Sequence, residues 1–72
     1  MNNKEWYEIA ISWSDGGTET IKIKESLTDA IDYAKNSKAL HGKYVDFLFI
    51  DRWYLEKGNA IKYEQDAIII NK

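Results

Sequence analysis

The sequence predicts a single small α+β domain, residues 1–72, in which two strands, one helix and two further strands follow one another. Three observations predict this order. Apolar residues alternate on both sides of a glycine-rich turn near the start, a helical stripe of apolar residues follows a serine, and two apolar runs flank a second turn near the end. The expected architecture is an antiparallel or mixed four-stranded sheet with one helix packed on one face.

The first two strands are predicted to form a hairpin. Every second residue from 7 to 13 is large and apolar, which is typical of a half-buried strand, and residues 14–17 form a turn. A loop of residues 15–17, with Gly17 in the left-handed conformation, is a common hairpin closure. It sets the isoleucines opposite one another in two pairs, Ile11 with Ile21 and Ile9 with Ile23. A slip of one residue would expose half of these side chains.

The helix is predicted over about residues 27–39. Ser26 is the expected N-cap, and Asp29, three residues later, is the acid of a near-capping box. Apolar residues then recur at spacings of three and four, which predicts a stripe that packs on the sheet: Leu27, Ala30, Ile31 and Ala34. Gly42 is expected to stop the helix.

The third strand, about residues 44–55, is the most apolar segment, and a turn at residues 56–59 leads into the last part of the chain. Residues 64–66 are either a bulge inside one long fourth strand or a break between two strands, and the sequence leaves both open. With the second hairpin beside the first, the layout resembles a β-grasp arrangement. That resemblance concerns element order only and implies no function.

The composition excludes several kinds of chemistry. The chain has no cysteine and one histidine, His41, so disulfides, thiolate zinc sites and a polyhistidine metal site within one chain are excluded. Asp46 and Asp51 are five residues apart on one strand, and this odd spacing sends them to opposite faces, where they cannot act as an acid–base pair. We therefore expect no enzyme, no cofactor and no catalytic or metal-binding residues.

The start of the chain shows no apolar run behind a basic segment, and the longest apolar stretch is residues 47–50. We therefore expect no signal peptide, no membrane span and a cytoplasmic location. The net charge of −2 is too balanced for binding to nucleic acid by bulk charge.

The third strand is apolar on both sides, and a single helix covers only one of them. The odd-numbered side has the greater apolar volume and is assigned to the core with Ile11: Val45, Phe47, Phe49, Trp53 and Leu55. Asp51 on that side either marks the end of the buried segment, which is preferred, or is a buried acid with a partner. The even-numbered side then faces outward and predicts a contact surface: Trp6, Tyr44, Asp46, Leu48, Ile50, Arg52 and Tyr54. The alternative is that these are singly exposed side chains, which are normal on a surface.

These observations favour a small binding protein, an adaptor or inhibitor of bacterial or phage type, whose partner is another protein or a second copy of itself in a homodimer. The alternative is a nucleic-acid-binding module in which Trp6, Tyr44 and Tyr54 stack on bases. Acidic residues are interspersed among the lysines and leave no basic stripe, which disfavours that alternative. No membrane and no small-molecule substrate is expected as a partner.

Overall fold

The computed structural model describes residues 4–72, apart from the side chains of Tyr63 and Asp66. Residues 1–3, which contribute to the expectation of no signal peptide, lie outside the described residues. The elements confirm the predicted α+β class and order: β1 (Glu5–Trp13), β2 (Thr18–Lys24), α1 (Leu27–Asn36), the short 3₁₀ helix η1 (Lys38–His41), β3 (Val45–Glu56) and β4 (Asn59–Asn71). Within residues 4–72, no helix has the length and apolar character needed to cross a membrane.

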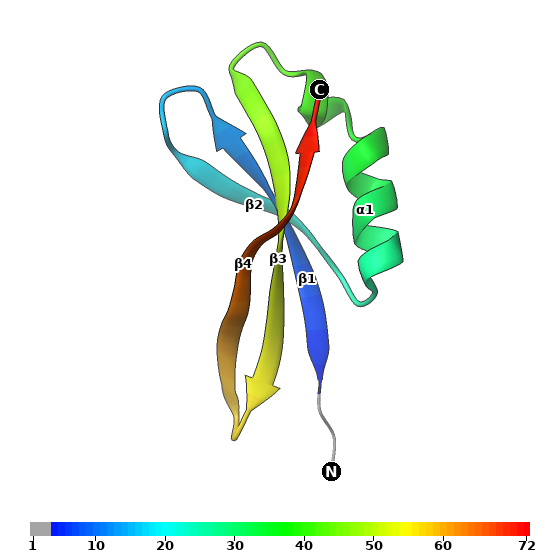
Figure 1. Cartoon of the computed structure of the whole chain (residues 1–72), viewed down its shortest axis with the longest axis vertical. Helices are drawn as coiled ribbons and strands as arrows, with labels where there is room; N and C mark the ends of the chain where they lie inside the picture. Colours follow the sequence, from blue (N-terminus) through cyan, green and yellow to red (C-terminus); the bar gives the residue numbers. More distant parts are fainter. Residues whose placement is uncertain (1–3) are drawn as a thin grey trace.

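The four strands form one sheet in the order β2-β1-β3-β4, with every neighbouring pair antiparallel. The second hairpin thus lies beside the first, as expected, through the pairing of β1 with β3. The sheet is strongly twisted and the molecule is elongated, 44 × 23 × 15 Å (Figure 1). α1 lies beside the upper half of the sheet, and the β3–β4 hairpin extends below it (Figure 1).

The helix begins as the sequence predicts and ends earlier. The Ser26 hydroxyl accepts a hydrogen bond from the Asp29 backbone N–H at 3.1 Å, which confirms the N-cap. The helix stops at Asn36 because Ser37 adopts an extended conformation. The chain then makes one 3₁₀ turn, η1. The Gly42 N–H caps its end by donating a hydrogen bond to the Ala39 carbonyl oxygen at 3.1 Å.

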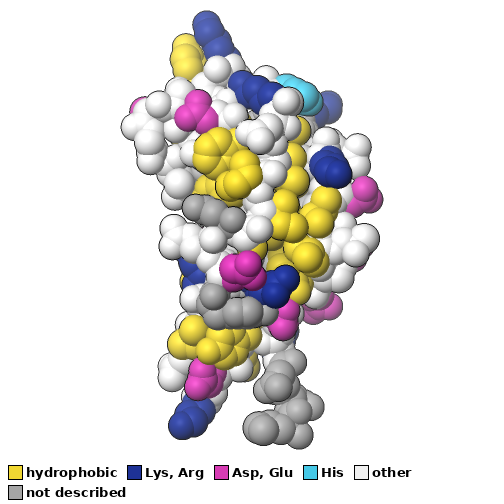
Figure 2. All heavy atoms as spheres, in the orientation of Figure 1, with side chains coloured by type: hydrophobic (Ala, Val, Ile, Leu, Met, Phe, Trp, Pro, Cys, Tyr) yellow, Lys and Arg dark blue, Asp and Glu magenta, His cyan; other side chains and the backbone are white. Residues whose placement is uncertain are grey.

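The core lies between α1 and one face of the sheet. Ala30 and Ala34, the small residues of the predicted stripe, are fully buried and allow the helix to approach the strands closely. The buried cluster contains these residues: Tyr7, Ile9, Ile11, Ala30, Ala34, Leu40, Val45, Leu48, Ile50 and Ile70. Figure 2 shows hydrophobic side chains gathered along the line where the helix meets the sheet.

The predicted face of β3 is wrong from Phe47 onward, whereas Val45, at a register shift, is in the core as predicted. In the register between β1 and β3, Ile9 lies opposite Ile50 and Ile11 opposite Leu48. Residues directly opposite one another share a face, so the odd-numbered residues of β1 lie on the same side of the sheet as the even-numbered residues of β3 from Leu48 to Tyr54. Leu48 and Ile50 are fully buried. The odd-numbered residues from Phe47 to Leu55, assigned to the core from the sequence, lie on the face opposite α1.

The predicted register of the first hairpin is also wrong. The loop is residues 14–16, closed by a hydrogen bond from the Trp13 N–H to the Gly17 oxygen at 2.8 Å, and Gly16 has φ +97°. Ile11 therefore lies opposite Glu19. A bulge across from Ile9 and Ala10 adds one residue to β2, so Ile9 pairs with Lys22. The bulge also sends Ile23 to the outer side, opposite Glu8, with 54% of its surface exposed.

Gly16→Ala is expected to destabilise the protein by about 1–2 kcal/mol, because a Cβ is unfavourable at this left-handed backbone position. Gly17→Ala is the matched control, since Gly17 is not at positive φ. Its added Cβ meets only the exposed Asp15 carboxylate oxygen at 3.3 Å and the Trp13 ring at 4.0 Å, so we expect a change below about 0.5 kcal/mol. Chemical denaturation measures both, and a larger loss for Gly17→Ala would support the loop predicted from the sequence.

The last part of the chain is one strand rather than two. β4 pairs with β3 at both of its ends, and the register shifts between Ile50 and Arg52 and between Arg52 and Trp53. The question left open for residues 64–66 is thus resolved as an irregularity within β4. Asp51 lies at this irregularity, between the flanking pairs Ile50–Ile68 and Arg52–Glu64.

Candidate protein-binding face

The face of the sheet opposite α1, here called the outer face, carries apolar side chains that no element of the described chain covers. The large ones with solvent-accessible surface come from all four strands: Trp6, Ile23, Phe47, Trp53, Leu55 and Ile69. Ile23 is 54% exposed, Ile69 42% and Leu55 38%, whereas the aromatic members are half-buried. Apolar surface that is shared by several strands on one uncovered face is typical of an interaction site.

Aromatic contacts organise this face at both ends. Trp6 and Trp53 are opposite one another on β1 and β3, and their rings stack with centroids 6.3 Å apart and planes 8° apart. Farther along β3, Phe47 meets Phe49 edge to face at 6.2 Å. Phe49 lies between Ala10 and Ile69 and is only 7% exposed, so its predicted burial is correct although it is on the other face.

Asp51 is a buried acid with a partner, contrary to the preferred interpretation of the sequence. Its surface is 4% exposed, and its Oδ2 accepts the Lys62 ammonium at 3.2 Å. The same ammonium lies 5.3 Å from the centroid of the Trp53 ring. A carboxylate that is buried on a sheet face is stabilised when a cation is held this close.

The residues predicted as one contact surface are divided among separate places. Leu48 and Ile50 are in the core, which contradicts their assignment to an exposed surface. Trp6 lies on the outer face as predicted. Tyr44 and Asp46 are exposed near the start of β3. The Tyr44 backbone carbonyl accepts a hydrogen bond from the Ser14 backbone N–H at 2.7 Å, next to the first hairpin loop.

Arg52 and Tyr54 lie on the same side of the sheet as the core, because the register sets them opposite Tyr7 and Glu5 of β1. The Arg52 guanidinium is 5.7 Å from the Tyr7 ring centroid and 3.5 Å from a Glu64 carboxylate oxygen. The Tyr54 hydroxyl donates to Glu56 at 2.8 Å. These two side chains are therefore separated from Trp6 by the sheet itself, and the predicted surface does not form a single patch.

The outer-face residues that sequence reasoning missed are Ile23, Phe47, Trp53, Leu55 and Ile69. For Phe47, Trp53 and Leu55 the signal was present, because the odd-numbered side of the third strand is the bulkier one. Ile23 is turned outward by the bulge in β2, and Ile69 follows its β3 neighbour Phe49. What was missing was the register with β1, which places that side away from the helix.

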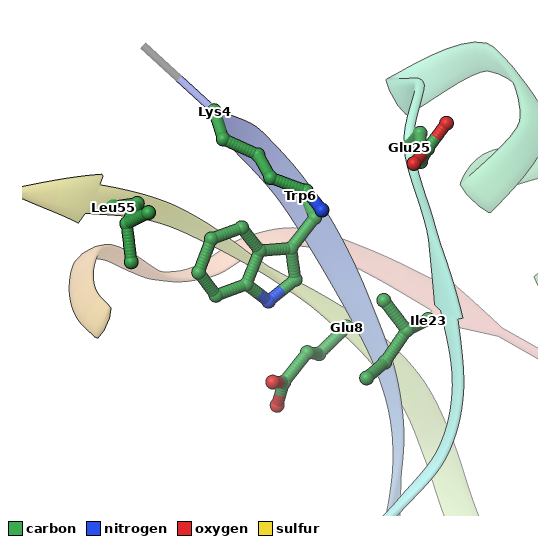
Figure 3. Close-up of a pocket in the computed structure, with 6 residues that line it drawn as sticks. All are labelled: Lys4, Trp6, Glu8, Ile23, Glu25 and Leu55. Carbon is green, nitrogen blue, oxygen red and sulfur yellow. The ribbon is translucent and has the colours of Figure 1, made fainter. Parts of the chain in front are cut away.

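An open groove borders Trp6 on the outer face. Its volume is about 470 Å³, and its walls come from the following residues: Lys4, Trp6, Glu8, Ile23, Glu25 and Leu55. In Figure 3, Leu55 and Ile23 stand on opposite sides of the indole, and the Glu8 carboxylate lies near the indole nitrogen edge. The groove thus combines an aromatic surface, two apolar side chains and carboxylates.

The part of the chain that the structure describes contains no cluster of three or more histidine or acidic side chains able to hold a metal ion. The chain matches no protein-family model, no curated protein and no solved structure.

Proposed function

We propose that this protein is a non-catalytic protein-binding module that contacts its partner through the outer face. The observation that supports it is the uncovered apolar surface shared by the four strands, with Ile23, Leu55 and Ile69 each more than one third exposed. Tryptophans are enriched among the residues that dominate binding energy, and Trp6 and Trp53 lie together within this surface. The charged residues around them set orientation rather than bulk affinity.

The partner is a protein rather than a lipid or a small substrate, because the surface is broad and runs along the sheet. Phe47 and Ile69 lie near one end and Leu55 lies near the other, on the extended hairpin. A partner that buries this surface binds only the folded protein and therefore stabilises it by mass action. This matters for a chain of 72 residues, because a chain of this length buries relatively little surface by itself. Action as an adaptor or inhibitor, either on a foreign protein or in a homodimer, is consistent with this arrangement.

The proposal is tested by photo-crosslinking in the cell that produces the protein. A benzophenone side chain placed at Leu55 or Ile69 samples the outer face, and the same group at Asp32 samples the exposed side of α1. We expect a discrete crosslinked product from positions 55 and 69 and none from position 32. A product of about twice the 8.4 kDa chain mass identifies a second copy, which light scattering across a concentration series checks.

Two results would contradict the proposal. One is a product of equal yield from position 32, because it would show contact without preference for a face. The other is the lack of any product from positions 55 and 69 under conditions where the variants are folded. The double substitution Leu55→Lys and Ile69→Lys should reduce partner binding at least about tenfold, because it removes apolar burial at both ends of the surface.

The nucleic-acid alternative has one observation in its favour, the stacked pair of Trp6 and Trp53. Two carboxylates, Glu8 and Glu25, line the groove beside Trp6 and repel phosphates. We therefore expect no micromolar binding to a labelled single-stranded oligonucleotide at low salt. Tight binding with a steep salt dependence in a fluorescence anisotropy titration would favour this alternative over the protein-binding function.

A further inference from the structure

We propose that the groove beside Trp6 binds a lysine side chain of the protein that docks on the outer face. This inference rests on the proposed function and names the chemistry that the partner must present. It is based on a comparison between two halves of the outer face, one of which already holds a lysine of this chain.

The first half is built around Trp53. Trp53 and Asp51 are two residues apart on β3, so their side chains point to the same face. The Lys62 ammonium is placed between them, 5.3 Å from the ring centroid of Trp53 and 3.2 Å from Asp51 Oδ2. The protein thus holds one lysine by combining the face of an indole with a carboxylate.

The second half repeats this arrangement on the neighbouring strand. Trp6 and Glu8 are also two residues apart, and the register sets Trp6 opposite Trp53 and Glu8 opposite Asp51. The acid follows the tryptophan on β1 and precedes it on β3, so in the antiparallel register the two tryptophan–acid pairs lie side by side on one face of the sheet. Lys62 reaches the Trp53 ring from β4, whereas the groove borders the Trp6 indole, with Ile23 of β2 on one side and Leu55 of β3 on the other.

The groove has the charge and the shape that a lysine side chain requires. The Lys4 side chain runs beside Trp6 at the border of the groove (Figure 3), and the groove itself is open to solvent. Glu8 and Glu25 supply two carboxylates and Lys4 one ammonium, which leaves a net charge of −1 in the groove. Ile23 and Leu55 offer apolar walls for the methylene groups of the incoming stem, and the Glu8 carboxylate, near the indole nitrogen edge, receives its ammonium (Figure 3).

The test titrates the full chain with n-butylammonium chloride, which has the ammonium and four-carbon stem of lysine, and follows ¹H–¹⁵N spectra. Sodium chloride holds the ionic strength constant, and n-butanol is the neutral probe of matched length. We expect saturable shifts at the Trp6 indole N–H and at the amides of Glu8 and Ile23, with butanol binding at least about threefold more weakly. A Trp6→Phe variant assigns the indole signal.

The Glu8→Gln, Glu25→Gln double variant should weaken butylammonium binding at least about threefold, because both carboxylates lose their charge. Glu19→Gln, on β2 but opposite Ile11 on the other side of the sheet, is the control and should leave the affinity unchanged. Overlay of the spectra confirms that each variant is folded.

Three results would overturn the inference: equal binding of butanol, unchanged affinity in the double variant, or shifts spread over the surface without saturation. None of them depends on the protein partner. Crosslinking from position 69, outside the groove, reports whether the outer face binds a protein even if the amine does not bind. Failure of the lysine site and failure of the proposed function are therefore separate outcomes.

Discussion

Ile50→Lys is expected to unfold the protein. Ile50 has no exposed surface and lies on the central strand β3, between Ile9 on β1 and Ile68 on β4. A lysine there places an ammonium group beneath α1 with no acid in the buried cluster to receive it. Burial of an unpaired charge costs several kcal/mol, which is comparable with the roughly 4–11 kcal/mol expected for the whole of a 72-residue chain.

Leu55→Lys is the matched control for Ile50→Lys. It makes a similar change on the same strand, but at an outer-face position that is 38% exposed. We expect its melting temperature to stay within a few degrees of the wild type, since a change below about 0.5 kcal/mol is usual for an exposed site. Circular dichroism and thermal melting measure both variants. A folded Ile50→Lys protein beside an unfolded Leu55→Lys protein would show that the two faces of β3 are reversed.

This pair of variants addresses the part of the fold that could not be predicted from the sequence. The elements follow from local signals, such as the Ser26 cap and the alternation along β1, because those signals act within a few residues. The pairing of β1 with β3 joins segments more than thirty residues apart, and no local pattern specifies it. The observed register sets odd-numbered residues of β1 opposite even-numbered residues of β3, so Ile9 and Ile50 share one face. The largest apolar side chains of β3 lie on the other face.

Apolar volume misled the choice of face for a physical reason. Ala30 and Ala34 bring the helix close to the sheet. The space between the helix and the sheet then suits aliphatic side chains such as those of Leu48 and Ile50. The bulkier aromatic residues pack laterally on the outer face instead, as the stacked Trp6 and Trp53 rings do. The side of a strand with the greatest volume is therefore not always the core side when the covering helix is lined with alanine.

The candidate site was predictable only in its general character. An uncovered apolar sheet face follows from one helix and a strand that is apolar on both sides, and this expectation agrees with the structure. The residues of that face depend on two register details, the β1–β3 pairing and the bulge that turns Ile23 outward. The burial of Asp51 depends on the irregularity of β4, which alternation along β3 does not reveal.

The ion pair between Asp51 and Lys62 is expected to be the strongest stabilising charge interaction on the outer face. The Asp51 side chain is 6% exposed, so loss of the Lys62 ammonium leaves a nearly buried carboxylate with one fewer charged partner. We expect Lys62→Met to cost about 1–3 kcal/mol, a range that allows for partial solvent screening of Lys62, whose side chain is 35% exposed.

A double-mutant cycle separates this ion pair from the packing of the lysine stem. In an Asp51→Asn background, Lys62→Met should lower the free energy of unfolding by at least about 1 kcal/mol less than in the wild type. The reason is that no Asp51 carboxylate is then left buried without the lysine. Glu64→Gln is the control, since Arg52 and Glu64 are 31% and 48% exposed and 3.5 Å apart, and its cost should stay below about 1 kcal/mol. Urea denaturation measures all four proteins of the cycle. Equal costs for Lys62→Met in both backgrounds would show that the other contacts of Asp51 hold the carboxylate and that Lys62 acts only through its contact with Trp53.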